Sequence, residues 1–177
     1  MDAKLITALV SIILLLIFFS LMLRGWRSRL ERQKSLGLSL PPVPAYFDQQ
    51  EPRAVYEGVY VSSTVAGDWL DRVGVASLGY KAEAQFFVFD QAVIIARQGA
   101  KDILIWKQQL VAVRTEAGIN GKFVEKDGLV VLTWNLNGVE LDSGFRTRYA
   151  GQKSQLVDDL KGLCAPGSAR QTSKESI

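Results

Sequence analysis

Few side chains in this sequence could carry acid–base, metal or nucleophilic chemistry. There is no histidine, so the commonest general acid–base group and the commonest metal ligand are both missing. Asp68 and Asp71 lie three residues apart and could bind a metal ion or exchange a proton, although a solvated turn in which Asp68 caps a short helical segment also accounts for them. Cys164, the single cysteine, has no histidine to activate it and is interpreted as a small buried side chain. We therefore predict a protein that is not an enzyme and that uses no cofactor or metal.

The glycine and tryptophan residues bear on two further kinds of binding site, a nucleotide-binding loop and an aromatic recognition surface. The segment 118–122, GINGK, has neither the spacing nor the strand-to-helix context of a nucleotide-binding loop. Trp106 and Trp134 fall within predicted strands, which favours positions in the core. Trp69 lies in a predicted loop, where a role in recognition and simple surface exposure are both open.

Three basic residues and one tryptophan define a candidate face for a partner or ligand. They are Trp69, Arg72, Lys122 and Arg146. Together with Arg148, the three cations could line a site for an anion or a lipid headgroup; ordinary surface charge is the competing interpretation. The loop at 62–81 contains Arg72 and Lys81 but also Asp68 and Asp71, a mixture that departs from a site for phosphorylated lipids.

An uncharged stretch of nineteen residues, Leu5 to Leu23, lies near the amino terminus. At roughly 1.5 Å per residue, a helix of this length just crosses a hydrocarbon core of about 30 Å. A buried core helix would show a polar stripe, and a secretory signal peptide would end in small residues at a cleavage site. This stretch has neither feature and ends at Arg24 and Trp26. It therefore predicts a transmembrane helix at 4–24.

The charges that flank this stretch predict its orientation. Basic residues resist translocation, so the arginine-rich carboxyl side should stay in the cytoplasm and the amino terminus should lie outside. The residues expected at the membrane interface are Lys4, Arg24, Trp26, Arg27, Arg29, Arg32 and Lys34. This cluster could also attract anionic lipid, but fixing the topology is the simpler role. A cell-membrane location with a cytoplasmic carboxyl-terminal domain follows.

The positive charge of the chain is confined to this region. Residues 1–34 hold six basic and two acidic residues, whereas residues 53–164 hold thirteen of each sign. The folded part thus lacks the basic footprint of a nucleic-acid-binding domain. The single cysteine allows no intrachain disulfide, which fits a cytoplasmic domain.

Beyond the predicted span, the sequence divides into three parts. Residues 25–52 form a basic segment, which extends the helix to about residue 36, followed by a proline-rich spacer. Residues 53–164 form one domain, and residues 165–177 form a disordered tail.

The domain shows the period-two pattern of short antiparallel strands, followed by one amphipathic helix. The predicted strands are 55–61, 82–89, 92–97, 102–106, 110–116, 129–136 and 139–145, and residues 122–126 lie between two turn signals. Glu57 shares a face with Val55, Val59 and Val61, which favours an edge position for the first strand. Asn137-Gly138 predicts a tight hairpin between the last two.

Within the last two strands, Val130, Leu132, Trp134 and Leu136 should share one face. Val139, Leu141 and Phe145 should point inward, opposite Glu140, Asp142 and Arg146. A short helical turn is predicted at 68–73. The final helix should pack an apolar stripe of Leu156, Val157, Leu160, Leu163 and Cys164 against the sheet.

About seven antiparallel strands in a partly open barrel, capped by a carboxyl-terminal helix, is the architecture of pleckstrin-homology-like (PH-like) domains. Four strings carry a closer resemblance: Asp68-Trp69-Leu70-Asp71-Arg72-Val73, Ala117-Gly118-Ile119-Asn120-Gly121-Lys122, Gly128-Leu129-Val130-Val131-Leu132-Thr133-Trp134 and Ser143-Gly144-Phe145-Arg146. With the overall layout, they resemble the bacterial PH-like proteins of actinobacteria, in which one transmembrane helix precedes one such domain. The resemblance implies fold and topology and brings no established activity.

We therefore expect a membrane-anchored, non-enzymatic PH-like interaction or scaffold module. Its partners would be the lipid bilayer and a protein of unknown identity, with no nucleic acid. The alternative is a sensor of inner-leaflet lipid or of a small ligand.

Overall fold

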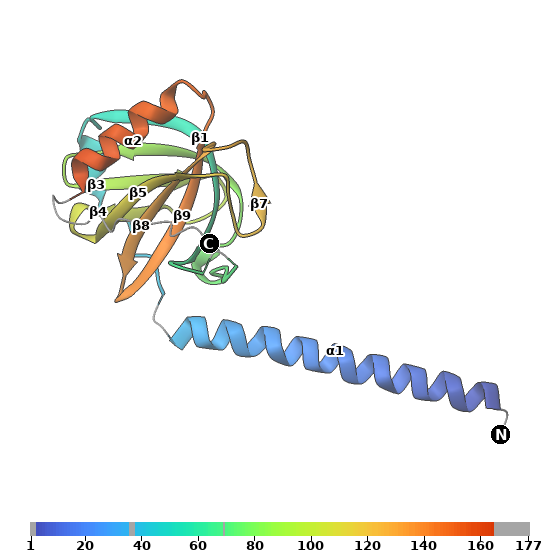
Figure 1. Cartoon of the computed structure of the whole chain (residues 1–177). Helices are drawn as coiled ribbons and strands as arrows, with labels where there is room; N and C mark the ends of the chain where they lie inside the picture. The colour runs from blue at the N-terminus through green and yellow to red at the C-terminus, as the bar shows by residue number, and fades with distance from the viewer. Residues whose placement is uncertain (1–2, 36–37, 69, 165–177) are drawn as a thin grey trace. The chain divides into compact units, whose positions relative to one another are not determined.

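The structure is a computed structural model that describes residues 3–35, 38–68 and 70–164. Side chains are described throughout these ranges except at 3–8, 26, 29–35 and 123. The chain divides into two compact units, Met1–Gly37 and Leu38–Ile177. The first unit is a single helix, and the second is a strongly curved sheet with one helix packed on it (Figure 1).

The helix of the first unit, α1 (Ala3–Ser35), has 33 residues and continues through the basic segment, as expected. Within the described part of the chain, no helix has both the length and the apolar character that a membrane crossing requires. The predicted transmembrane span at 4–24 is therefore corrected to an amino-terminal helix, and the location deduced from it stays a prediction.

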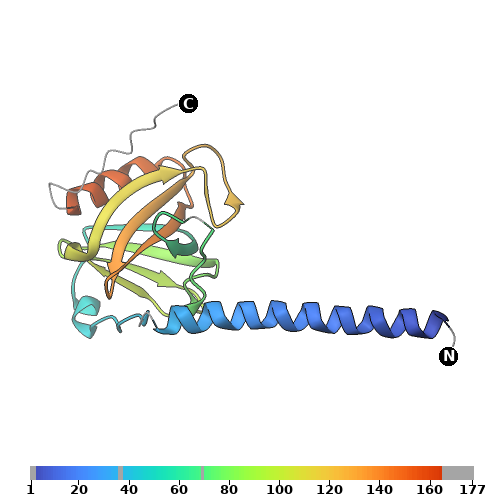
Figure 2. The same ribbon diagram turned by 60° about the horizontal axis from the view of Figure 1, so that its bottom comes forward.

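The second unit is built on one seven-stranded antiparallel sheet. Its strands are β1 (Ala54–Val65), β2 (Ala82–Val88), β3 (Ala92–Arg97), β4 (Ile103–Trp106), β5 (Leu110–Glu116), β8 (Leu129–Leu136) and β9 (Val139–Thr147). Their order is β4-β3-β2-β1-β9-β8-β5, so β1 is the middle strand, with three strands on either side. The sheet curls around the core, and α2 (Gln152–Leu163) lies along its open end (Figure 2).

β1 is a central strand, and the predicted edge position is wrong. It pairs with β2 through Ala54–Tyr60 and with β9 through Gly58–Val65. Glu57 does not interrupt an inward face, because Tyr56 and Tyr60 are the residues that enter the core. A register shift between Tyr60 and Ser62 then reverses the alternation, so that Ser63 points inward and Thr64 points outward.

The main core lies between the sheet and α2, as predicted. Trp134, Leu132 and Phe145 are fully buried in it, and the rings of Phe86 and Phe145 lie 5.0 Å apart. The buried side chains of α2 are Leu156, Val157, Leu160 and Leu163, and Cys164 packs against the same cluster. The apolar stripe of the last helix is thereby confirmed.

The proline-rich segment does not stand clear of the domain. Leu38 and Leu40 are buried in the main core. After Pro44, a short 3-10 helix, Ala45–Gln49, places Phe47 in a second cluster, where its ring lies 5.8 Å from that of Trp106. The segment from residue 38 onward thus belongs to the folded unit.

A line of hydrogen-bonded side chains crosses the main core. Trp134 Nε1 donates to Ser143 Oγ at 2.8 Å, the Ser143 and Ser63 hydroxyls lie 2.5 Å apart, and Ser63 Oγ lies 2.7 Å from Tyr60 Oη. Tyr60 donates its proton to the carbonyl of Leu78 at 2.6 Å. Because that proton is used, Ser63 must donate to Tyr60 and Ser143 to Ser63. The direction of the line is therefore fixed from Trp134 to Leu78.

A buried arginine holds the loop that follows β1. Arg97 is 4% exposed and donates to the carbonyls of Ala76, Ser77 and Lys101. Ala76 and Ser77 adopt positive φ angles of 53° and 58°, which few residues other than glycine do. The guanidinium also lies 4.8 Å from the centre of the Tyr60 ring. The loop is thus fixed by backbone carbonyls that Arg97 satisfies, and the predicted helical turn at 68–73 is replaced by turns and by a 3-10 helix at Val75–Ser77.

A small hairpin covers part of the outer face of the sheet. β6 (Gly118–Ile119) and β7 (Lys122–Phe123) pair around Asn120 and Gly121, whose φ angles are 53° and 68°. Ile119 packs with Val61, Leu129 and Val131 in a third cluster. Beneath it, a Cβ on Gly144 would lie 2.9 Å from Leu129 Cδ2 and 3.0 Å from Ile119 Cγ2, so the close approach requires glycine.

Candidate functional site

The structure brings together two of the four residues predicted to form a partner or ligand face. Lys122, on β7, donates from Nζ to the carbonyl of Val61 at 3.2 Å. Burial lowers the pKa of Lys122, and the positive charges of Arg72 and Lys81 lower it further. We refer to Arg72, Lys81 and Lys122 as the basic cluster.

The Arg72 side chain is closely surrounded within this cluster. Its guanidinium lies 5.1 Å from the centre of the exposed Tyr80 ring. A Cβ on Gly79 would lie 2.5 Å from Arg72 Nε, so glycine leaves room for the arginine to pass. Trp69, the aromatic member of the predicted face, lies outside the described residues.

Arg146, another member of the predicted face, pairs with a carboxylate. Its Nη2 donates to both carboxylate oxygens of Glu125, at 3.1 and 2.9 Å, and both side chains are about half exposed. A backbone hydrogen bond, together with the hydrogen bond and charge of Arg146, lowers the pKa of Glu125. Arg148 lies near another carboxylate, with 3.8 Å between its Nη1 and Glu57 Oε2. The predicted four-residue face stays a prediction.

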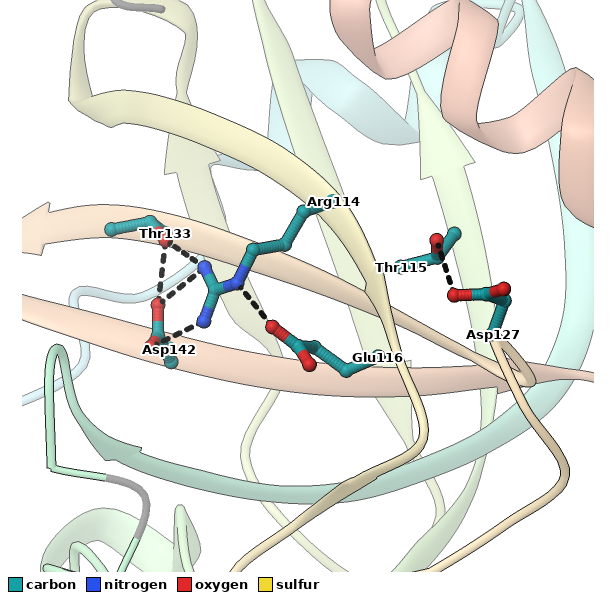
Figure 3. A network of polar contacts seen from close by, with 6 residues as sticks. All are labelled: Arg114, Thr115, Glu116, Asp127, Thr133 and Asp142. Carbon is teal, nitrogen blue, oxygen red and sulfur yellow. Dashed lines mark hydrogen bonds and ion pairs between the residues drawn. The ribbon is translucent and has the colours of Figure 1, made fainter. Parts of the chain in front are cut away.

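The best-formed polar site of the domain, which the sequence did not reveal, lies on the outer face of β5, β8 and β9. Arg114 donates from Nη2 to Asp142 Oδ2 at 2.7 Å, from Nη1 to Thr133 Oγ1 at 2.7 Å and from Nε to Glu116 Oε1 at 2.9 Å. Thr133 in turn donates to Asp142 Oδ1 at 2.6 Å. Figure 3 shows the guanidinium between the two carboxylates.

The members of this network differ in exposure. The Asp142 side chain is 9% exposed, whereas Arg114 and Glu116 are 41% and 46% exposed. Asp142 was expected on the outward face; it does point away from the core, but it is buried there. Burial disfavours the charged form of Arg114, yet its hydrogen bonds to Asp142 and Glu116 outweigh burial and raise its pKa. Asp142 is thus hydrogen-bonded by both Arg114 and Thr133.

A cavity of about 360 Å³, here called the outer cavity, opens beside this network. Its lining residues are Thr64, Arg114, Glu116, Ala117, Gly118, Ile119, Val131 and Asp142. Thr64 lies directly opposite Asp142 in the pairing of β1 with β9 and is fully buried. Its hydroxyl has no hydrogen-bond partner among the described residues. The outer cavity therefore combines an apolar wall, paired charges and an unused hydroxyl.

One signal in the sequence could have located part of this network. Asn137 and Gly138 have φ angles of 52° and 87°, as a two-residue hairpin requires, and Leu136 pairs with Val139. Counting back from this turn places Thr133 opposite Asp142. Arg114 cannot be found in this way, because a register shift between Leu110 and Ala112 interrupts the pairing of β5 with β8.

The contacts and burial of the remaining candidate residues favour structural roles. Asp68 Oδ1 accepts from the amides of Leu70 and Asp71 at 3.0 and 3.2 Å, which caps a turn. Cys164 is partly buried and burial raises its pKa, which disfavours the reactive thiolate. Trp134 is fully buried, as predicted, and Trp106 packs partly buried against the second cluster.

Of the predicted membrane-interface residues, Arg24 and Arg27 are exposed on α1. The side chains of the others lie outside the described residues: Lys4, Trp26, Arg29, Arg32 and Lys34.

Comparison with protein families matches residues 38–161 to the family described as bacterial PH domain-like. The chain belongs to this family. The match includes the seven-stranded sheet, the small hairpin and most of α2, and begins at the buried Leu38. It shows a PH-like domain and no specific function, and an actinobacterial origin is not supported.

Comparison with solved structures finds distant similarities. The carboxyl-terminal domain of an unknown protein from Leishmania infantum is 10% identical, with 67% of this chain and 87% of that chain covered and a TM-score of 0.42. A chain of the 8S snRNP assembly intermediate is 10% identical, with coverages of 76% and 95% and a TM-score of 0.46. An inhibitor-bound Vav1 is 15% identical, with coverages of 79% and 33% and a TM-score of 0.41. No curated protein matches the PH-like chain significantly.

Proposed function

We propose that this protein is a non-enzymatic interaction module: α1 attaches it to the cytoplasmic side of a lipid bilayer, and its PH-like domain binds a protein partner. The observation that carries the proposal is the surface of α1. The large apolar side chains from Leu9 to Met22 are each half or more exposed, up to 72% at Phe18. A continuous apolar surface of this kind marks a binding surface for protein or lipid.

The distribution of charge supports attachment through lipid. Arg24 and Arg27 follow the apolar residues on the same helix and are exposed. Basic side chains beside an apolar surface are attracted to anionic lipid headgroups, at about 1 kcal/mol for each residue near the membrane. The PH-like domain has its own buried core and offers its outer face for recognition.

Flotation of the full chain with vesicles of phosphatidylethanolamine and phosphatidylglycerol tests the attachment. We expect the chain to float with the vesicles and to remain bound in 1 M salt, because apolar contacts are not screened. A variant carrying Leu15→Asp and Phe18→Asp should stay at the bottom of the gradient, whereas a control with Leu70→Asp and Tyr149→Asp, two exposed residues of the domain, should float. Equal flotation of both variants would refute attachment through α1.

The partner is tested separately by photo-crosslinking in the cells of origin. A photoreactive side chain at the exposed Ala117 is compared with one at the exposed Ser154 of α2. A protein that is crosslinked only from position 117, in repeated experiments, supports recognition by the outer face. The absence of any adduct that depends on position would contradict the proposed partner.

A second function, sensing of an anionic ligand, is favoured by the basic cluster. An anion bound between Arg72, Lys81 and Lys122 would offset the repulsion that lowers the pKa of Lys122. Addition of inorganic phosphate, or of vesicles that contain phosphatidylglycerol, should then raise that pKa in a nuclear magnetic resonance titration. The exposed Lys161 serves as a control. A rise with vesicles alone identifies lipid, a rise with phosphate identifies a free anion, and no rise with either eliminates this function.

A further inference from the structure

The outer cavity has the composition of a site for a single cationic side chain. Glu116 and Asp142 contribute two negative charges to its wall, against one positive charge from Arg114. Binding pockets for drug-sized molecules span roughly 300–1,000 Å³, so a cavity of about 360 Å³ suits one side chain better than a cofactor. The excess of one carboxylate favours an occupant of positive charge.

The oxygen atoms that line the outer cavity can accept further hydrogen bonds. Asp142 Oδ2 accepts only from Arg114, and Glu116 is bonded through Oε1, so Oε2 makes no hydrogen bond among the described residues. The hydroxyl of Thr64 is buried without a partner, although buried hydroxyls are almost always hydrogen-bonded. Three acceptors on the wall of one cavity correspond to the three N–H donors of a primary ammonium group.

The rest of the wall is apolar. Ile119 and Val131 are buried in the third cluster, and their side chains line the outer cavity together with Ala117. Lysine carries its ammonium group on four methylene groups, which bury well against such a wall while the charge reaches polar atoms.

We propose that the outer cavity binds a lysine side chain of the protein partner. The aliphatic chain lies against Ile119 and Val131, and the ammonium group donates to Thr64 Oγ1, to Glu116 Oε2 and to Asp142 Oδ2, which also accepts from Arg114. This inference rests on the proposed function, because it assigns the chemistry by which the PH-like domain recognises its partner.

Binding is tested with a minimal probe, Nα-acetyl-lysine methylamide, added to the full chain in lipid nanodiscs. Methyl resonances of Thr64, Ile119 and Val131 report occupancy of the outer cavity. We expect saturable shifts with the lysine probe and at least tenfold weaker binding of Nα-acetyl-norleucine methylamide, which has a similar stem without the charge. Equal binding of the two probes, or no saturable shift with lysine, would overturn the proposal.

Two variants remove the proposed acceptors without removing buried partners. Glu116→Gln deletes a charged acceptor on a half-exposed side chain and should weaken the lysine probe about tenfold. Thr64→Val deletes the hydroxyl and keeps the shape of the side chain. Because this hydroxyl has no partner in the described structure, the variant should be as stable as the natural protein, or more so, and still bind lysine more weakly.

A matched control separates the site from general charge effects. Asp158→Asn removes one carboxylate from the exposed face of α2 and should leave probe binding unchanged. If Asp158→Asn weakens binding as much as Glu116→Gln does, the effect is not local and the proposal fails.

The crosslinking experiment distinguishes this failure from failure of the proposed function. An adduct from position 117 that persists in Glu116→Gln and Thr64→Val leaves the interaction module intact and refutes the lysine site. Loss of the adduct in both variants, with Asp158→Asn unaffected, supports both.

Discussion

Substitution of Ser143 by alanine tests the directed line of hydrogen bonds in the core. Ser143 accepts from Trp134 Nε1 at 2.8 Å and lies 2.5 Å from Ser63. Both Trp134 and Ser143 are almost completely buried, so no water can replace the lost acceptor. An unsatisfied buried donor costs about 1–3 kcal/mol. We therefore expect Ser143→Ala to lower the free energy of unfolding by about 2 kcal/mol.

The same reasoning predicts a comparable effect at the other end of the line. Tyr60→Phe removes the donor to the Leu78 carbonyl, but that carbonyl still accepts from the backbone amide of Ser63 at 2.7 Å. The hydroxyl of Ser63 loses the Tyr60 oxygen as its acceptor, so one of the two serine hydroxyl donors is left unpaired whichever way they turn. The expected loss is about 1–3 kcal/mol.

Chemical unfolding of the full chain in mild detergent, followed by far-ultraviolet circular dichroism, measures these differences. Ser154→Ala, at an exposed serine of α2, is the control and should change stability by less than about 0.5 kcal/mol. In a Trp134→Phe background the unpaired donor is gone, so Ser143→Ala should cost at least about 1 kcal/mol less than in the natural protein. Identical costs in the two backgrounds would refute the reasoning.

Three further predictions concern other parts of the domain. Arg97→Met should destabilise the protein by about 2–4 kcal/mol, because carbonyls such as that of Ser77 lose their donor; protection from hydrogen exchange at 76–78 should fall first. Gly58→Ala should cost more than about 3 kcal/mol in a thermal unfolding experiment, since a Cβ there would lie 2.1 Å from the backbone oxygen of Arg146. Burial raises the pKa of Tyr60 to about 12 from 10.0. The contribution of Tyr60 to the free energy of unfolding is complete below pH 10 and is lost as the pH rises from 10 to 12, because only the unfolded state loses the proton in that window. The free energy of unfolding of Tyr60→Phe should therefore fall less steeply with pH between 10 and 12 than that of the natural protein.

Much of the domain follows from local sequence patterns. The strands with clean alternation, the Asn137-Gly138 hairpin and the apolar stripe of the last helix all appear where they are predicted. Each depends on residues within a few positions of one another, such as a tight turn or one face of a helix. The sequence therefore predicts the PH-like fold without information from distant contacts.

The errors arise where a distant contact decides the outcome. Glu57 suggested an edge strand, but Gly58 allows β9 to pass close to β1 and makes the strand central. A bulge after Tyr60 then reverses which side chains point inward, and no turn residue in the sequence predicts this bulge. The predicted helical turn at 68–73 is absent from the described residues, because Asp71 and Val73 form backbone hydrogen bonds with Val65 and Ser63 of β1.

In the candidate site, the strand pairing of some residues can be counted from a turn in the sequence, and that of others cannot. Thr133 and Asp142 are separated by a two-residue hairpin, so their pairing follows from the position of the turn. Arg114 reaches them from β5, whose register with β8 shifts between Leu110 and Ala112, and Thr64 reaches them from beyond the bulge in β1. The two side chains that give the outer cavity its positive charge and its unused hydroxyl thus both come from bulged strands. Because a bulge changes the face on which every following side chain lies, such a cavity becomes visible only when the strands are assembled.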